Sequence, residues 1–242
     1  MSESPPSSPA ALPRRLGLPH FAARVTYILL AVNVIVYLAD LLSGNFLTML
    51  GALVPALVTD YGQSWRVVTA GFLHGGITHI AMNLYALYGL GRLMERFYGP
   101  WRFAAVYLLS LTGASILVTL LSDPARAMVG ASGAIMGVTG ALLIYFWRYR
   151  QLLVGARGFL PRLGRMALIN VAVGLLPGIS WWGHLGGLLA GIGVGAVLLP
   201  KYVHADWTAD HLEMQTLDAS NQVGLAAIVV GEAVLLTVWA LT

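Results

Sequence analysis

The sequence contains no cysteine and few charged residues. The absence of cysteine excludes disulfide bonds, thiolate catalysis and cysteine-bound metals. Only 10% of the 242 residues are charged, whereas 58% are hydrophobic; a soluble domain carries roughly 25% charged residues. Because the chain has too little polar surface to cover itself in water, and its apolar residues fall in long runs, we expect it to lie in a lipid bilayer.

Several other classes of protein are disfavoured by what is missing. The net charge of +4 comes from basic residues scattered between apolar runs, so no nucleic-acid binding is expected. There is no His-Glu-x-x-His pair to hold zinc, and neither a metal nor a cofactor is expected. An aspartyl intramembrane protease needs two carboxylates within its spans, but the aspartates here lie only at the ends of apolar runs or between them. That class is therefore disfavoured. The Gly-x-Ser-x-Gly elbow of soluble hydrolases fails at Ala134.

The apolar runs predict an all-α polytopic membrane protein with a six-helix core and a seventh, C-terminal transmembrane helix. A spanning helix needs roughly 20 apolar residues, and such runs lie near 25–42, 77–97, 101–122, 131–147, 163–179, 182–199 and 222–241. The chain is accordingly divided into a disordered cytoplasmic tail rich in Pro and Ser, the core, a cytoplasmic linker and the seventh helix, at residues 1–20, 21–200, 201–221 and 222–242.

The basic residues predict the orientation of these helices. With the N-terminus in the cytoplasm, all 14 Lys and Arg residues except Arg66 and Arg126 fall in cytoplasmic segments. The C-terminus is then outside, and the cell membrane is the expected location. The external segment 43–76 is long and apolar but contains Pro55 and several glycines. We therefore expect it to be partly inserted against protein rather than to span.

Four polar residues in the expected spans are candidates for function: His79, Asn83, Ser132 and His184. Taken singly, such a residue more often bonds its own helix or a neighbouring one than takes part in catalysis. Their depths, however, agree. Ser132, His184 and His79 each lie about 24 to 25 Å of helix from a basic residue at the inner surface, and Asn83 lies one turn deeper than His79 on the same face.

Together these residues contain the parts of a serine hydrolase. A serine is a poor nucleophile until a base takes its proton, and histidine is the natural base near neutral pH. Ser132 begins a span, so its backbone N–H is free to bind an oxyanion, and Asn83 and His79 add side-chain donors. Close helix packing is predicted by glycines beside the serine and along the sixth span: Gly130, Gly133, Gly183, Gly187, Gly191 and Gly195.

These patterns resemble the rhomboid family. The stretch Gly130-Ala131-Ser132-Gly133 is similar to the family's nucleophile motif. His184 with Gly187 and Gly191 is similar to its histidine helix, and His74-x4-His79-x3-Asn83 to its second-span pattern. Matches also occur at Gly91-x3-Glu95-x3-Gly99 and Trp65-Arg66, so the resemblance covers about residues 25–199.

The resemblance implies a six-helix core with a water-filled catalytic cavity open to the outside and a half-inserted first loop. It implies a Ser132–His184 dyad without an acid. It further implies cleavage of single-span or other transmembrane proteins near the outer face of the lipid bilayer.

Two features depart from the family pattern. A seventh span occurs only in some members, and here it carries Glu232 near its middle. A carboxylate at that depth is costly, so Glu232 is expected to face protein, protonated or paired, in a structural role. Met136 stands four residues after Ser132, where the family commonly has an aromatic ring packed on the catalytic imidazole.

Two functions other than proteolysis are weighed against this interpretation. A non-catalytic rhomboid-like protein that binds and escorts membrane clients would not need the dyad, and both members of the dyad are present. A transporter would have broken helices at the midplane of an inverted repeat, and the sequence has no such symmetry. An intramembrane serine endopeptidase is therefore the preferred interpretation.

Overall fold

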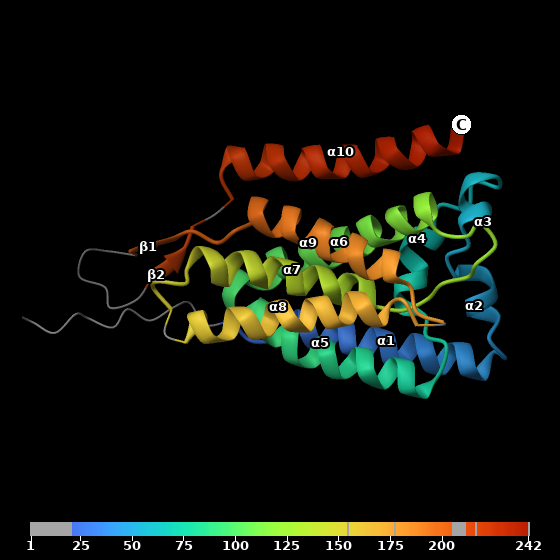
Figure 1. Ribbon diagram of the computed structural model, residues 1–242, viewed down its shortest axis with the longest axis horizontal. Coiled ribbons are helices and arrows are strands. Elements are labelled where there is room, and N and C mark those ends of the chain that lie inside the picture. The colour runs from blue at the N-terminus through green and yellow to red at the C-terminus, as the bar shows by residue number, and fades with distance from the viewer. Residues whose placement is uncertain (1–20, 154, 177, 205–211, 216, 242) are drawn as a thin grey trace, which may run out of the picture.

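The computed structural model describes residues 21–153, 155–176, 178–204, 212–215 and 217–241. The tail expected at 1–20 lies outside these residues. Within them, seven long helices run side by side as a bundle (Figure 1), in the order and near the positions expected of the seven spans. They are α1 (Arg24–Leu42), α5 (Ile77–Tyr98), α6 (Pro100–Leu121), α7 (Ser132–Arg148), α8 (Ala156–Val173), α9 (Trp181–Val197) and α10 (Ala219–Leu241).

By length and composition alone, three of the described helices can cross a membrane: Arg24–Leu42, Pro100–Leu121 and Ala219–Thr237. α7 and α9 have 17 residues each, or about 26 Å of helix, against a hydrocarbon core of about 30 Å. Most side chains of α7 are buried among other helices. A helix in that position is held by its neighbours and needs less apolar surface of its own.

α8 differs from its predicted range of 163–179 at both ends. The helix begins earlier because Arg157, Arg162 and Arg165 are exposed while the face that contains Leu163 is buried, so a charged stretch extends an amphipathic helix. It ends earlier, at Val173, and the residues after it form the turn into α9. Hydropathy alone had placed the helix on the apolar run and not on its packing face.

The main chains of α7 and α9 touch. A Cβ added to Gly187 would stand 2.0 Å from the carbonyl oxygen of Gly133, and one added to Gly191 would stand 2.0 Å from that of Gly137. No side chain fits in such a gap, since real Cβ atoms essentially never approach another heavy atom this closely. The close packing predicted from the glycine stripe is confirmed.

The segment 43–76 contains only short helices: α2 (Phe46–Gly51), α3 (Pro55–Thr59), α4 (Arg66–Thr69) and the 3-10 turn η1 (Ala70–Phe72). Arg66 joins α4 to the end of α2 by donating to the carbonyl oxygen of Ala52 at 2.7 Å, and Trp65 Nε1 donates to that of Leu50 at 3.2 Å. These short helices lie at one end of the bundle (Figure 1). The segment is not a span, as predicted.

The amino end of α1 is bonded to α5. Glu95, which is fully buried, accepts hydrogen bonds from the backbone amides of Val25 and Thr26 at 2.8 and 2.9 Å and from the Thr26 hydroxyl at 2.8 Å. Amides in the first turn of a helix have no acceptor within the helix. Gly91 leaves room for this contact, because a Cβ there would stand 3.1 Å from Thr26 Cγ2. The Gly91-x3-Glu95 pattern thus joins the first two long helices.

The linker expected at 201–221 contains a short antiparallel pair, β1 (Tyr202–His204) and β2 (Leu212–Met214). The pair lies at the opposite end of the bundle from α2 to α4 (Figure 1). α10 follows and begins at Ala219, slightly before the predicted start of the seventh span.

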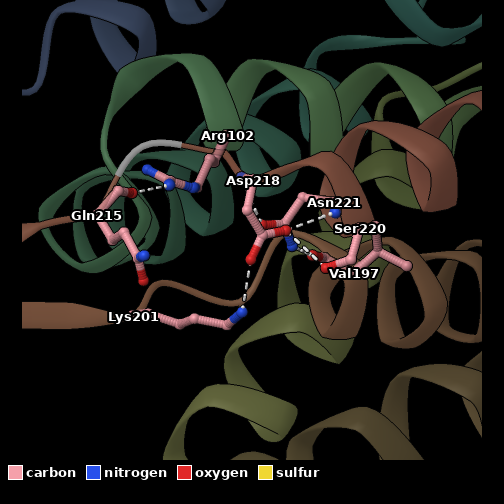
Figure 2. Close-up of polar contacts among 7 residues, drawn as sticks. All are labelled: Arg102, Val197, Lys201, Gln215, Asp218, Ser220 and Asn221. Carbon is pink, nitrogen blue, oxygen red and sulfur yellow. Dashed lines mark hydrogen bonds and ion pairs between the residues drawn. The ribbon is translucent and has the colours of Figure 1, made fainter.

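A group of polar contacts, which we call the Asp218 cluster, fixes the start of α10 to the end of α9 (Figure 2). The Asp218 carboxylate accepts hydrogen bonds from Lys201 Nζ at 2.9 Å, from the Ser220 hydroxyl at 2.6 Å and from the Asn221 amide at 2.9 Å. The Asn221 side chain donates to the carbonyl oxygen of Val197. Asp218 therefore caps α10 and binds it to the preceding segment.

Candidate functional site

Ser132 is the first residue of α7 and follows an unusual turn. Gly130 has a φ of 126°, a conformation that residues with a Cβ rarely adopt. Its amide donates to the carbonyl oxygen of Ala70 at 2.9 Å, which fixes the turn to the segment 43–76. The Ser132 amide lies in the first turn of the helix, where it has no acceptor within α7. The backbone N–H and the hydroxyl of Ser132 therefore both lie at the start of α7, where the N–H has no partner within the helix.

His79 and Asn83 of α5 lie beside this turn. A Cβ at Gly130 would stand 2.6 Å from His79 Nε2 and 3.8 Å from Asn83 Nδ2. Asn83 is 7% exposed, and its amide group donates one hydrogen to the carbonyl oxygen of His79 at 3.1 Å. An amide carries two hydrogens, so a second one is available to another acceptor. The structure thus brings both α5 residues next to the residues that precede Ser132.

His184 lies in the first turn of α9 and is 6% exposed. Ser180 caps this turn: its hydroxyl oxygen accepts from the Gly183 amide at 3.0 Å, and its carbonyl oxygen accepts from the His184 amide at 3.1 Å. The imidazole Nδ1 of His184 lies 2.6 Å from the carbonyl oxygen of Asn170 in α8. Both the main chain and the ring of His184 are therefore held.

The contact with Asn170 determines which ring nitrogen is basic. A carbonyl oxygen only accepts, so Nδ1 must carry the hydrogen, and Nε2 keeps a lone pair. This carbonyl is available because Asn170 lies in the last turn of α8, where its helical partner, the Gly174 amide, is 3.2 Å away and shared with Val171. A neutral imidazole with a free Nε2 is the form that a general base requires.

α7 and α9 bring the neighbours of Ser132 and His184 into contact. A Cβ at Gly133 would stand 3.4 Å from the carbonyl oxygen of Gly183, and these two glycines adjoin Ser132 and His184 in the chain. Among the hydrogen bonds of the described residues, none joins Ser132 Oγ to the His184 ring. Bonds of this kind are often long in unliganded enzymes. The two residues lie on adjoining turns of touching helices.

His74 and Met136, the two remaining candidates from the sequence, are both buried, with 4% of each residue exposed. The His74 ring packs edge-on against His79, with centroids 5.1 Å apart. Burial, with a smaller contribution from His79, lowers the pKa of His74 to about 4, so this ring is neutral at physiological pH. Met136 lies one turn after Ser132 in α7. Its contact with His184 remains a prediction.

Asn170 and Gly174 were not among the sequence candidates. Asn170 acts through its main chain, which no residue type signals, and the predicted span placed it in mid-helix. A Cβ on Gly174 would stand 2.4 Å from Cα of Trp181, the first residue of α9. This close approach keeps the end of α8 beside the start of α9 and hence beside His184. A glycine followed three residues later by a proline, here Pro177, is a helix-stop signal that could have revealed it.

A cavity of about 200 Å³ opens beside the start of α9, on the turn between α8 and α9. Its lining includes Arg126, Ser180, Trp181 and Trp182 but neither Ser132 nor His184. The cavity is therefore separate from the pair.

A family model described as Rhomboid domain matches residues 61–201. RHOMBOID-like protein 6, mitochondrial, of Arabidopsis thaliana is 38% identical over 161 residues, which cover 65% of this chain and 51% of that protein. Rhomboid protease GluP of Bacillus subtilis (strain 168) is 34% identical over 183 residues, which cover 73% of this chain and 35% of that protein. The chain thus spans about half the length, or less, of these two curated relatives.

Proposed function

The chain belongs to the rhomboid family, and on that premise we propose that it is an intramembrane serine protease with Ser132 as nucleophile and His184 as general base. Its apolar helices and rhomboid domain make it an integral membrane protein. Proteases occur in the family, since one relative is named rhomboid protease GluP and another, from Emericella nidulans, rhomboid-type serine protease 2.

The observation that carries the proposal is the contact between His184 Nδ1 and the Asn170 carbonyl oxygen at 2.6 Å. It leaves Nε2 as the basic nitrogen at the end of α9 that adjoins Ser132. A structural role would be met by this bond alone; a catalytic role is favoured by the position of the ring, in the turn of α9 that packs against the start of α7 and Ser132. The Asn170 carbonyl orients the His184 ring, as the aspartate carboxylate orients the histidine in a Ser-His-Asp triad.

The proposed reaction is acyl transfer in two steps. His184 Nε2 takes the proton of Ser132 Oγ as that oxygen attacks the carbonyl carbon of the scissile peptide. The imidazolium then gives the proton to the leaving amine, and an acyl-enzyme remains on Ser132. Water, activated by the same nitrogen, hydrolyses the ester and restores the serine.

Three donors are assigned to the oxyanion of the tetrahedral intermediate: the Ser132 amide, His79 and Asn83. The amide lies at the start of α7, where it has no helical partner. The second amide hydrogen of Asn83 is not used in its bond to the His79 carbonyl. His74 and Met136 are proposed to support the site by packing, His74 against His79 and Met136 against the His184 ring.

We further propose that the substrates are single-span or other transmembrane proteins, cut near the outer face of the cell membrane. Ser132 and the short helices α2 to α4 would lie toward that face. The N-terminus and the β1–β2 pair would lie on the cytoplasmic side, as the distribution of basic residues favours, and the C-terminus would lie outside.

The test is cleavage of a panel of single-span substrates by the purified protein in liposomes, together with labelling by a fluorophosphonate. Ser132→Ala should lose both cleavage and labelling, and His184→Ala should lose turnover by several orders of magnitude, because the members of such a unit fail together. Asn83→Ala should keep the label but cleave about 100- to 1000-fold more slowly.

Each of these results has a clear opposite. Substantial cleavage by Ser132→Ala would refute the nucleophile, and full activity of a folded Asn83→Ala would refute its oxyanion role. A wild-type protein that binds membrane substrates but neither cleaves them nor takes the label would instead be a non-catalytic rhomboid-like protein that escorts membrane clients.

A further inference from the structure

α10 carries one acidic residue, Glu232, within an otherwise apolar stretch. The side chain is half-buried and faces α6, where its Oε2 lies 2.5 Å from the Thr112 hydroxyl. α10 has no basic residue, and the basic side chains of α6 and α9, Arg102 and His184, lie near the starts of those helices. The partner of this carboxyl is therefore a hydroxyl rather than a cation.

The hydrogen count at Thr112 favours a neutral carboxyl. The Thr112 oxygen lies within hydrogen-bonding distance of Glu232 Oε2 and of the Leu109 carbonyl oxygen, at 3.0 Å. A hydroxyl carries only one hydrogen, and a carbonyl oxygen can only accept. With an ionised Glu232, Thr112 donates to Oε2; with a neutral Glu232, the carboxyl donates to Thr112 and the hydroxyl hydrogen goes to Leu109, which satisfies both contacts. A neutral acid also avoids the cost of a charge within a bilayer.

Glu232 lies where α6, α9 and α10 meet. A Cβ on Gly113, the residue after Thr112, would stand 2.6 Å from the Cβ of Ala190 in α9 and 3.3 Å from Glu232 Oε1. The carboxyl thus rests against a point of close approach between α6 and α9 at Gly113. A change in the seating of α10 acts directly on this junction.

The next residue of α6, Ala114, packs behind the proposed catalytic pair. A Cβ on Gly133 would stand 2.7 Å from Ala114 Cβ, and one on Gly186 would stand 3.1 Å from Ala114 Cα. Gly133 adjoins Ser132, and Gly186 lies two residues after His184. Close packing leaves no slack between these groups, so a displacement of α6 at Thr112 to Ala114 reaches both.

We infer that Glu232 and Thr112 form a hydrogen-bonded contact that seats α10 against α6 and thereby positions Ser132 and His184. Glu232 is a positioning residue and takes no part in the chemistry. The effect on turnover rests on the proposed function, whereas the seating of α10 does not.

The first experiment compares Glu232→Leu, Thr112→Val and the double variant with Glu232→Gln. Glu232→Leu and Thr112→Val should each lower kcat about tenfold with little change in KM, because a displacement well below 1 Å is enough for such a loss. The double variant should be no slower than either single one, since both changes remove the same contact. Glu232→Gln can still donate to Thr112 and should retain nearly full activity. A wild-type kcat in Glu232→Leu would overturn the inference.

A disulfide between α9 and α10 tests whether Glu232→Leu lowers the rate because α10 has moved or for another reason. A Cβ on Gly224 would stand 3.7 Å from the Cβ of Val197, close to the roughly 3.8 Å that a disulfide prefers, and the chain has no other cysteine. In Glu232→Leu, a disulfide between Val197→Cys and Gly224→Cys should restore at least half of the lost rate, and reduction should abolish the gain. A tether that forms but restores nothing would refute positioning through α10.

The contact between Thr112 and Glu232 is also tested by thermal unfolding, in Ser132→Ala variants that need no activity. There, Thr112→Val should lower the Tm by about 2 to 4 °C when residue 232 is Glu, and by much less when it is Leu. Additive shifts would mean that the two side chains do not interact, and the inference would fail even if the protease is active. A wild type that cleaves nothing would remove the proposed function but leave this measurement decisive for the contact.

Discussion

The interfaces of α9 with α7 and with α10 are built from different atoms. Where α9 meets α7, carbonyl groups rest on glycines, and even one Cβ on Gly191 would stand 2.0 Å from the Gly137 oxygen. Where α9 meets α10, side chains make the contact: a Cβ on Gly224 would meet the Val197 methyl groups at 2.9 Å, and the Asn221 amide binds the Val197 carbonyl. One interface is main chain against main chain, and the other is adjustable.

This difference has a physical basis. Within lipid there is no hydrophobic drive between helices, so association depends on close packing or on hydrogen bonds. Packing of main chains allows one relative position only, whereas side chains can rotate to several. The proposed catalytic residues lie at the main-chain interface between α7 and α9. The seventh helix, α10, is joined to α9 through side chains, which can adjust.

The largest effect is expected from Gly187→Ala. The new Cβ would stand 2.0 Å from the Gly133 carbonyl oxygen, so α7 and α9 must separate beside Ser132. We expect a loss of about 3 kcal/mol of stability and almost no cleavage. The measurements are thermal unfolding in detergent and the initial cleavage rate.

Gly193→Ala is the matched control for that change. Gly193 lies in the same helix with nothing within 4 Å of its added Cβ, so the variant should be as stable as wild type or up to about 1 kcal/mol more stable. Equal losses in both variants would mean that the effect belongs to α9 in general and not to its contact with α7.

A smaller effect is expected from Gly174→Ala, which tests the α8–α9 junction. The Cβ would stand 2.4 Å from Trp181 Cα, so the start of α9 must move away from the Asn170 carbonyl. We expect kcat to fall by about 10- to 100-fold with a nearly constant KM, and stability to fall by about 1 to 2 kcal/mol. Gly164→Ala, in open space on the same helix, should leave kcat unchanged; an equal loss there would contradict the explanation.

Gly224→Ala probes the adjustable interface and should change stability by less than about 1 kcal/mol. The nearest atoms are the methyl groups of Val197, at 2.9 and 3.2 Å, and a side chain can turn away where a carbonyl cannot. Adding Val197→Ala should remove whatever loss remains. A loss as large as that of Gly187→Ala would mean that the two interfaces are equally rigid.

The smallest effect concerns acid pH at the Asp218 cluster. The Ser220 hydroxyl and the Lys201 ammonium hold the pKa of Asp218 well below its usual value of 3.8. Its stabilising contribution is therefore present above about pH 4 and is lost as the pH falls. The Tm difference between wild type and Asp218→Asn should shrink as the pH is lowered from about 5 to 3. Parallel curves would show that the charge of Asp218 does not stabilise α10.

The long helices were predictable from the sequence because an apolar run marks the position of each one, even where, as in α7, neighbouring helices also hold it. Residue counts along single helices also predicted that Ser132, His79 and Asn83 lie at one level, and the structure places His79 and Asn83 beside the turn before Ser132; their depth and their roles stay predictions. The end of α8 was not predictable from hydropathy, because it is set by the contact of Gly174 with Trp181. The Asn170 carbonyl was missed for the same reason: its availability depends on where the helix ends.

The bond between Glu95 and the start of α1 has a consequence for synthesis of the chain. The Val25 amide is made 70 residues before its acceptor, an interval of about 4 to 14 s at ordinary rates of translation. Throughout that interval the Val25 and Thr26 amides lack this acceptor and must bind another one, such as water at the membrane surface. The bond can form only after the second long helix has been made, so the amino end of α1 is joined to protein 70 residues later in synthesis than its own sequence.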